Sequence, residues 1–349
     1  MKQTPWILLP VTLLAIAGCS ERKLGEPTPF PVEELVSGGV PKDGIPALTS
    51  PLKISASSAT FLAASSLVAG IAHNGDAVAY PIMVMDKHEV ANDRVGDRFT
   101  VLSYCPLTGT AIGFTGGRRG ETVEFGVSGL LFRNNLMMYD RSDDEQLWSQ
   151  MWGSGVTSAW AGTKLPRTPV LLMTWSLWRT LNPGTRVVDP AQINMGRTYG
   201  DGITYPGYDT SPRTLFTVKH KDDRLPPKQL VVGLIMSGTA RAYSIDALGT
   251  RVLADTLAGV PLLGVFLSGA DYGVVCSPVV GADSLQFALL NAADATAFMR
   301  DANTGSVWDA MGRAQSGPLA GTRLAVLSAY TAYWFAWADF YPGSEIYSP

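Results

Sequence analysis

Short apolar stretches alternate with turn residues along most of the chain, a pattern that is typical of β-strands. Leu67–Gly75 and Leu230–Gly238 are two such stretches of similar sequence, and they end in Asn74-Gly75 and Ser237-Gly238. Pairs of this kind between apolar flanks favour tight β-hairpins. The pattern therefore predicts a hairpin at a matching place in each half of the chain.

Further strands are expected after each hairpin, because apolar and β-branched residues recur between turn signals. In the first half the predicted strands are Arg98–Tyr104, Ala111–Phe114, Thr122–Val127 and Leu131–Tyr139. In the second half they are Val260–Leu267, Tyr272–Val275, Leu285–Leu290 and Ala295–Met299.

Each half closes with a predicted short helix that carries two tryptophans. Trp175-Ser-Leu-Trp178 precedes Pro183-Gly184, and Trp334-Phe-Ala-Trp337 precedes Pro342-Gly343. The i, i+3 spacing places both indole rings of a pair on one helical face. Such a pair could bind a sugar ring, but its presence in both halves favours packing in the core.

These matches indicate an internal duplication with a period too long for a solenoid. We predict an α+β fold dominated by β-structure, with two similar mixed β domains that each carry a short WxxW helix. The expected parts are a signal peptide at 1–18, a tether at 19–42, a first repeat at 43–188, a connector at 189–222 and a second repeat at 223–349.

The N-terminus is typical of a secreted lipoprotein. A basic Lys2 precedes an apolar run from Trp6 to Ala17, and Cys19 follows. A cysteine directly after Ala-Gly resembles the bacterial lipobox, which implies cleavage before Cys19 and its acylation. We expect a lipid anchor in the cell envelope. Because Ser20 is not the aspartate that favours inner-membrane retention, we expect the outer membrane, with the protein facing the periplasm.

Composition narrows the classes of partner. The net charge is −3 and no stretch is rich in Lys or Arg, so nucleic acid is not an expected partner. The membrane is expected only through the lipid on Cys19, and a protein or small-molecule partner stays open. Cys105 and Cys276 are the remaining cysteines, and the sequence leaves open whether they form a disulfide.

The first half also contains an ordered series of motifs. They are Ala79-Tyr80-Pro81, His88-Glu-Val-Ala-Asn-Asp93, Cys105-Pro-Leu-Thr-Gly109, Phe125-Gly-Val-Ser-Gly129, Met138-Tyr-Asp-Arg141 and Leu147-Trp-Ser-Gln150. Their order resembles the DUF3179 family of bacterial and archaeal proteins over nearly the whole mature chain. The resemblance implies no established activity. Thr108 stands where some relatives have cysteine, so no two-cysteine redox pair is expected.

His88 and Cys105 are the candidate site residues, because the turn between their strands could bring them together. The second half has neither: Arg251 stands where His88 would be, and the stretch near Leu267 lacks a cysteine. An imidazole and a thiolate suit copper or another transition metal. Further candidate ligands are Glu89, Asp93, Asp140, Met83 and Met85.

Three functions stay open. The first is a mononuclear metal-binding or redox protein, with copper held by His88 and Cys105. The second is a non-catalytic binding or assembly lipoprotein, in which both residues belong to the core and a peptide or glycan binds an aromatic surface or the groove between the halves. The third is an enzyme with Cys105 as the nucleophile and His88 as its base.

Overall fold

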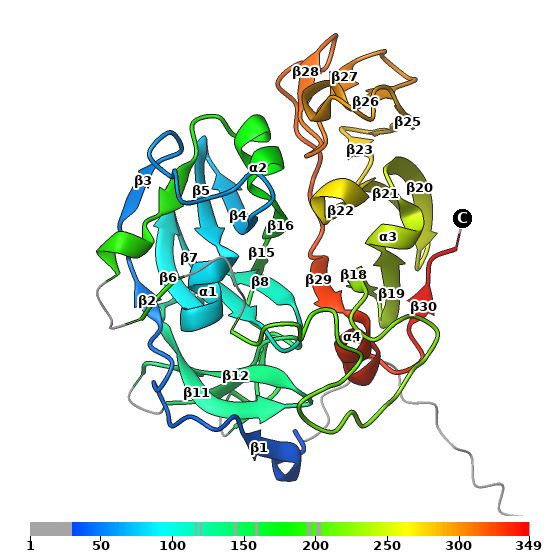
Figure 1. Ribbon diagram of the computed structural model, residues 1–349. Coiled ribbons are helices and arrows are strands. Elements are labelled where there is room, and N and C mark those ends of the chain that lie inside the picture. The colour runs from blue at the N-terminus through cyan, green and yellow to red at the C-terminus, as the bar shows by residue number, and fades with distance from the viewer. Residues whose placement is uncertain are drawn as a thin grey trace, which may run out of the picture.

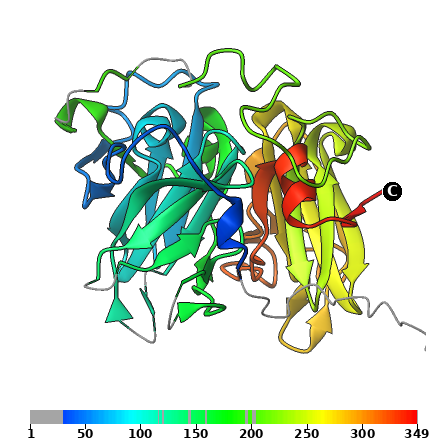
Figure 2. The ribbon, with the colours of Figure 1, turned by 90° about the horizontal axis from the view of Figure 1, so that it is seen from below.

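The computed structural model describes residues 30–348, except for 116, 119–120, 143–144, 158–159, 194–196 and 200–203. The predicted signal peptide, Cys19 and most of the predicted tether lie outside the described residues. Two bodies of β-structure lie side by side, blue to green and yellow to red (Figures 1 and 2). Strands make up 42% of the chain and helices 13%, which confirms the β-dominated α+β class.

The first half contains three five-stranded sheets. Their orders are β16-β4-β5-β17-β3, β15-β8-β7-β6-β2 and β1-β11-β12-β13-β14. The bounds are β1 Leu35–Ser37, β2 Leu48–Thr49, β3 Lys53–Ser55, β4 Leu67–His73, β5 Asp76–Pro81, β6 Val90–Val95, β7 Arg98–Cys105, β8 Thr110–Phe114, β11 Phe125–Phe132, β12 Asn135–Asp140, β13 Leu147–Ser149, β14 Ser154–Gly155, β15 Arg167–Thr168, β16 Leu171–Thr174 and β17 Arg186–Val188. The helices are α1 Ile82–His88 and α2 Trp175–Leu181, and a small hairpin joins β9 Gly117–Arg118 to β10 Glu121–Thr122.

The second half contains a central sheet, a three-stranded sheet and a small outer sheet. Their orders are β29-β18-β19-β30, β20-β21-β22 and β25-β26-β27-β28. The bounds are β18 Leu230–Met236, β19 Thr239–Ser244, β20 Arg251–Leu257, β21 Val260–Leu267, β22 Tyr272–Cys276, β25 Phe287–Leu289, β26 Met299–Asp301, β27 Val307–Trp308, β28 Ala314–Ser316, β29 Tyr330–Tyr333 and β30 Glu345–Ile346. A hairpin of β23 Val279–Val280 and β24 Asp283–Ser284 precedes the outer sheet, and the helices are α3 Ile245–Leu248 and α4 Trp334–Phe340.

The central sheets of the two halves share one arrangement. β4 pairs antiparallel with β5 and β16, and β17 runs parallel to β5. In the same way β18 pairs antiparallel with β19 and β29, and β30 runs parallel to β19. Both predicted hairpins are therefore confirmed. The common ancestry of the halves stays a prediction, although their local plan is the same.

The WxxW helices pack in the core. All four indole rings are at most 2% exposed. Trp178 Nε1 donates to Thr185 Oγ1 at 2.8 Å, and Trp337 Nε1 donates to Ser344 Oγ at 3.1 Å. The indole rings of Trp178 and Trp337 lie against Gly70 and Gly233, where a Cβ would overlap them. The packing interpretation is thus confirmed over a sugar-binding platform.

Three sequence expectations need correction. The predicted strand Leu131–Tyr139 is interrupted by a turn at Arg133-Asn134, because both residues adopt positive φ and reverse the chain between β11 and β12. The predicted strand Ala295–Met299 begins as a 3-10 turn, since the Asp294 side chain caps its free N–H groups. Part of the predicted tether is folded, because β1 pairs with β11.

The two halves also share a core. The hydroxyls of Tyr330 and Tyr341 donate to the carbonyl of Met151 at 3.3 and 3.1 Å. Arg133 Nη1 donates to the carbonyl of Asp339 at 2.8 Å. Aromatic residues from both halves belong to one hydrophobic cluster. Among the described residues, no helix is both long and apolar enough to cross a membrane.

The close packing of glycine under tryptophan predicts a specific sensitivity. Gly70→Ala and Gly233→Ala should each lower the free energy of unfolding by about 1–3 kcal/mol or more, because the added methyl group overlaps the indole ring. Gly184→Ala and Gly269→Ala are matched controls, since a Cβ there meets open space. Urea unfolding of the four variants checks this, and equal losses in all four would contradict the packing argument.

Candidate functional site

The two leading motifs lie on neighbouring strands. His88 ends α1, Glu89 caps it with φ of 55°, and β6 begins at the next residue. β6 pairs antiparallel with β7, which ends at Cys105. The carbonyl of Glu89 accepts a hydrogen bond from the N–H of Tyr104 at 2.6 Å. The turn between β6 and β7 thus places the backbones of the two motifs side by side, while the closeness of the His88 and Cys105 side chains stays a prediction.

His88 is buried with both ring nitrogens engaged. Nδ1 lies 2.7 Å from the carbonyl oxygen of Pro46, and Nε2 lies 2.6 Å from the hydroxyl of Tyr199. A carbonyl oxygen only accepts, so Nδ1 carries the proton and Nε2 accepts from Tyr199. Burial lowers the pKa of His88 and favours this neutral form. Neither nitrogen has a lone pair free for a metal in this arrangement.

Cys105 is a buried thiol. Its side chain is 1% exposed, and Sγ lies 3.8 Å from the carbonyl oxygen of Asn134. Burial raises the pKa of Cys105 to about 11, and the charge of Glu89 adds to the effect. A reactive or metal-binding cysteine needs the thiolate form. Cys105 and Cys276 are both free and buried, so they form no disulfide with each other.

Two of the further candidate ligands, Asp93 and Asp140, have other partners. Asp93 accepts from Lys53 Nζ and from the hydroxyl of Tyr80, both at 2.7 Å. Asp140 accepts from Trp148 Nε1 at 2.9 Å. Within the described part of the chain, no three His, Cys, Asp or Glu side chains gather into a group that could hold a metal ion. A copper site at His88 and Cys105 therefore stays a prediction.

Matched bonds in the second half show which of these residues belong to the scaffold. Tyr243 donates to Asp255 at 2.6 Å, as Tyr80 does to Asp93, and Trp308 donates to Asp301 at 2.8 Å, as Trp148 does to Asp140. Asp93 and Asp140 are therefore structural partners in a plan that recurs in both halves.

The same matching corrects one alignment. If the β6–β7 hairpin is aligned with the β20–β21 hairpin so that Asp93 matches Asp255, then Arg251 matches Glu89. The prediction that Arg251 matches His88 is therefore wrong. The register of the following strands places Leu267 opposite Cys105. The polar residues of the α1 end are therefore specific to the first half.

A buried polar network lies on the face of β7 that carries Ser103. Asn135 Nδ2 donates to Gln150 Oε1 at 2.6 Å, and Thr110 Oγ1 donates to the same oxygen at 2.7 Å. Gln150 Nε2 donates to Ser103 Oγ at 3.0 Å, and Thr108 joins through Asn135 at 3.0 Å. The five side chains are at most 1% exposed. We did not single out Asn135 or Gln150 from the sequence, although Gln150 closes one of the motifs.

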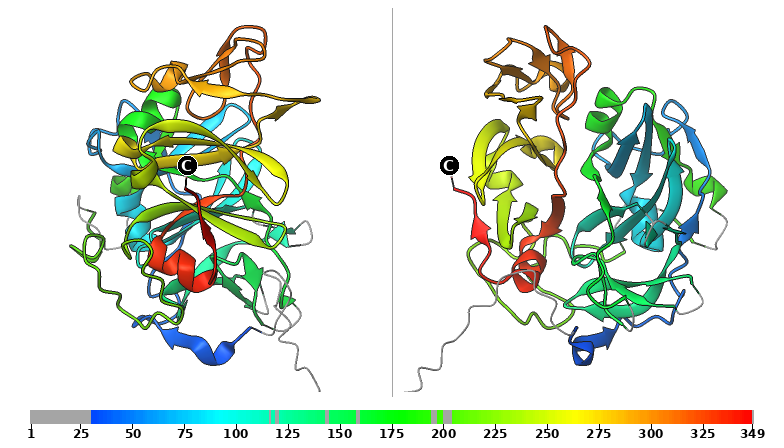
Figure 3. Two further views of the ribbon diagram at one scale, coloured as in Figure 1. Left: turned by 90° about the vertical axis from the view of Figure 1, so that its right-hand side faces the viewer. Right: turned by 180° about the vertical axis from the view of Figure 1, so that it is seen from behind.

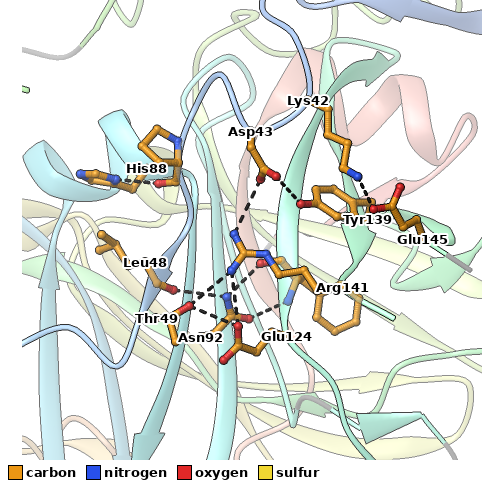
Figure 4. Close-up of polar contacts among 12 residues, drawn as sticks. Lys42, Asp43, Leu48, Thr49, His88, Asn92, Glu124, Tyr139, Arg141 and Glu145 are labelled. Atoms are coloured by element: carbon orange, nitrogen blue, oxygen red, sulfur yellow. Dashed lines mark hydrogen bonds and ion pairs between the residues drawn. The ribbon is translucent and has the colours of Figure 1, made fainter. Parts of the chain in front are cut away.

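A second set of contacts holds the segment 42–49 (Figure 4). The buried Asn92 donates to the carbonyl of Leu48 at 3.2 Å and accepts from the N–H of Phe125 at 2.7 Å. Arg141 lies 3.4 Å from a carboxylate oxygen of Glu124 and 3.7 Å from one of Asp43. These motif side chains therefore hold neighbouring strands and the segment 42–49 in place.

Comparison with known families now places the chain. A family model described as a protein of unknown function, DUF3179, matches residues 42–344. The chain belongs to the DUF3179 family. A search of curated proteins and a search of solved structures found no match. In this DUF3179 protein, the described motif side chains contact the protein's own strands and segments.

The state of His88 predicts how stability depends on pH. Its pKa is lower in the folded chain than the ordinary 6.5, so the unfolded chain binds the proton more tightly. The neutral His88 contributes fully to the free energy of unfolding above about pH 6.5. This contribution is lost as the pH falls through the folded pKa, by at most about 1.4 kcal/mol per pH unit. The free energy of unfolding, measured with urea between pH 5 and 8, should depend less steeply on pH in His88→Gln than in the wild type. Equal slopes would contradict a buried neutral imidazole.

The state of Cys105 predicts low reactivity. In the native protein at pH 7.5, iodoacetamide should label neither Cys105 nor Cys276, because burial raises the pKa of each thiol. Both should react after denaturation, which makes Cys276 an internal control. Mass spectrometry of the labelled peptides checks this. Rapid labelling of Cys105 alone would show a reactive thiolate there.

Proposed function

We propose that this protein is a non-catalytic binding or assembly lipoprotein, anchored in the cell envelope by a lipid on Cys19. The observation that carries the proposal is the engagement of both candidate reactive groups. His88 bonds through both ring nitrogens, and Cys105 is a buried thiol. A metal centre or a cysteine nucleophile needs one of these groups to be free, whereas a binding protein needs them only for its core.

The junction between the halves is a weak candidate for the binding surface. A hollow there, lined by residues such as Leu171 and Tyr330, has a volume of about 10 Å³. That is close to the space one water molecule needs. This hollow is therefore too small for a peptide or a glycan.

The outer sheet of the second half offers such a surface. It projects at the end of this half opposite α4 (Figures 1 and 3). Val279, Leu289 and Leu290 on and beside it are 41%, 40% and 44% exposed. In the described sheet, β25 is hydrogen-bonded to β26, and β20 of the three-stranded sheet lies close to β25 as well. Exposed apolar side chains that lie near one another favour contact with a protein partner.

The chemistry of this edge indicates the kind of partner. Between residues 279 and 294 the charged residues are Asp283 and Asp294, with no Lys or Arg. The exposed Arg300 pairs with Ala288 on the neighbouring strand, so this surface carries charges of both signs. A fitting partner is therefore a protein segment with apolar side chains. The segment would lie over Leu289 and Leu290 and cover both side chains.

Photo-crosslinking in the envelope tests this function. A photoreactive amino acid in place of Leu289 or Leu290 should give one discrete protein adduct, because the partner segment covers both positions. The same probe in place of Val260 is the matched control, since Val260 is 38% exposed in the same half. Ala288→Lys in the Leu289 probe chain should abolish the adduct.

Two outcomes would contradict the proposal. Equal adducts from positions 260, 289 and 290 would indicate nonspecific contact. About one copper per purified chain, lost in both His88→Ala and Cys105→Ser, would establish the metal function in its place.

A further inference from the structure

The connector contains a mostly exposed stretch with one buried residue. From Tyr205 to Leu215, a stretch that the structure describes throughout, Tyr208 alone is buried, and its side chain is 7% exposed. Tyr205 and Leu215 at the two ends are 37% and 52% exposed. A segment with few buried contacts is held to the protein mainly through the residues that make them. The contacts of Tyr208 therefore decide where the stretch 205–215 lies.

Tyr208 lies between a loop of the first half and a lysine of the second. Its hydroxyl donates to the carbonyl of Leu107 at 3.1 Å. The ammonium group of Lys228 lies 2.8 Å from the centre of its ring and donates to its backbone carbonyl at 2.9 Å. The rings of Tyr333 and Phe335 lie 5.5 and 5.4 Å from the same ammonium group. Because a cation is attracted to the face of an aromatic ring, Lys228 holds Tyr208 in place.

The connector is attached to the first half again just after this stretch. The N–H of Phe216 donates to Asn134 Oδ1 at 3.0 Å, and Asn134 Nδ2 donates to the carbonyl of Thr217 at 3.2 Å. The backbone carbonyl of the same Asn134 lies 3.8 Å from Cys105 Sγ. The other attachment, at Leu107, is two residues from Cys105 in the chain. Both attachments of the connector are therefore close to Cys105.

The loop that the connector contacts is one of the ordered motifs, Cys105-Pro-Leu-Thr-Gly109, and all of its residues are buried. The second half contacts the same loop, because the N–H of Tyr333 at the end of β29 donates to the carbonyl of Thr108 at 2.7 Å. β29 belongs to the central sheet of the second half, whereas no residue of the described stretch 205–215 is in a strand or a helix. The connector is therefore the weaker of two covers over the loop.

We propose that residues 205–215 form a strap that opens when Tyr208 leaves its place between Leu107 and Lys228, and that the open strap gives solvent access to the Cys105–Gly109 loop. Opening breaks the hydrogen bond to Leu107 and the contacts with Lys228, while the hydrogen bonds of the sheets stay intact. A local opening of this size costs less free energy than unfolding of the whole chain. A protein that binds the open connector shifts the chain toward the open form. The strap is separate from the outer sheet, so this proposal does not depend on the function proposed above.

Slow alkylation of Cys105 by iodoacetamide at pH 8.5 measures the opening, because the buried thiol reacts only while it is exposed. Lys228→Gln removes the cation over Tyr208 and should raise the rate of labelling by about 2- to 30-fold, the factor that one cation–π contact corresponds to. Lys221→Gln is the matched control, since Lys221 is an exposed lysine of the same connector, and it should follow the wild type. Cys276 is the internal control, because it is buried in another hydrophobic cluster, and it should keep its rate.

Tyr208→Phe tests the same opening at the other contact of Tyr208 and keeps the test valid if Lys228→Gln folds poorly. Without the hydroxyl the hydrogen bond to Leu107 is lost, so the labelling rate of Cys105 should rise by about 2- to 12-fold. The proposal is overturned if neither variant labels Cys105 faster than the wild type does. It is also overturned if the rate at Cys276 rises as much as the rate at Cys105, because both thiols would then react through unfolding of the whole chain.

Discussion

The contact between an indole ring and a glycine determines the arrangement of each half. In both central sheets the ring of a WxxW helix lies on a glycine of the predicted hairpin, Gly70 under Trp178 and Gly233 under Trp337. A residue larger than glycine would overlap the indole ring, and a ring smaller than indole would leave a cavity above the glycine. The helix therefore fixes the hairpin, and the hairpin fixes the strands on either side of it, including β5, from which α1 follows. The position of His88 and Glu89 thus depends on a packing contact in the core of the same half.

Polar residues in the motifs fix the strands more than they form an open site. Asn92 joins three strands through its amide group, and Gln150 joins β7, β8 and β12 through its own. A buried amide group is stable only where its donors and acceptors all have partners. If one arrangement of the strands provides these partners, the amide favours that arrangement over others. An ordered series of polar motifs can therefore be a signature of a fold, even though polar residues in a pattern first suggest chemistry.

The sequence predicts the elements with local signals well. Turn pairs such as Asn74-Gly75 and the WxxW spacing act over a few residues, and the structure has the hairpins and helices where they are expected. The turn at Arg133-Asn134 was missed because its strand flanks are continuous in apolar character and its second residue is not glycine. The state of His88 and Cys105 could not be predicted, since it depends on Pro46, Tyr199 and Asn134, which lie far from them in the sequence. Their residue types indicate metal or nucleophile chemistry, and only the tertiary contacts show that both groups are already engaged.

The difference between the halves is concentrated at the end of α1. Both halves have the tyrosine–aspartate and aspartate–tryptophan bonds, but the first half alone has a helix of seven residues that ends in His88, and α3 has four. The longer helix reaches the connector, where it meets Tyr199 and Thr204. The second half uses its corresponding space differently, because Arg251 falls where Glu89 would be. The first half therefore contacts the connector through a longer helix than the second half has at the corresponding place. Polar residues that are specific to the first half are thus used in contacts with the connector.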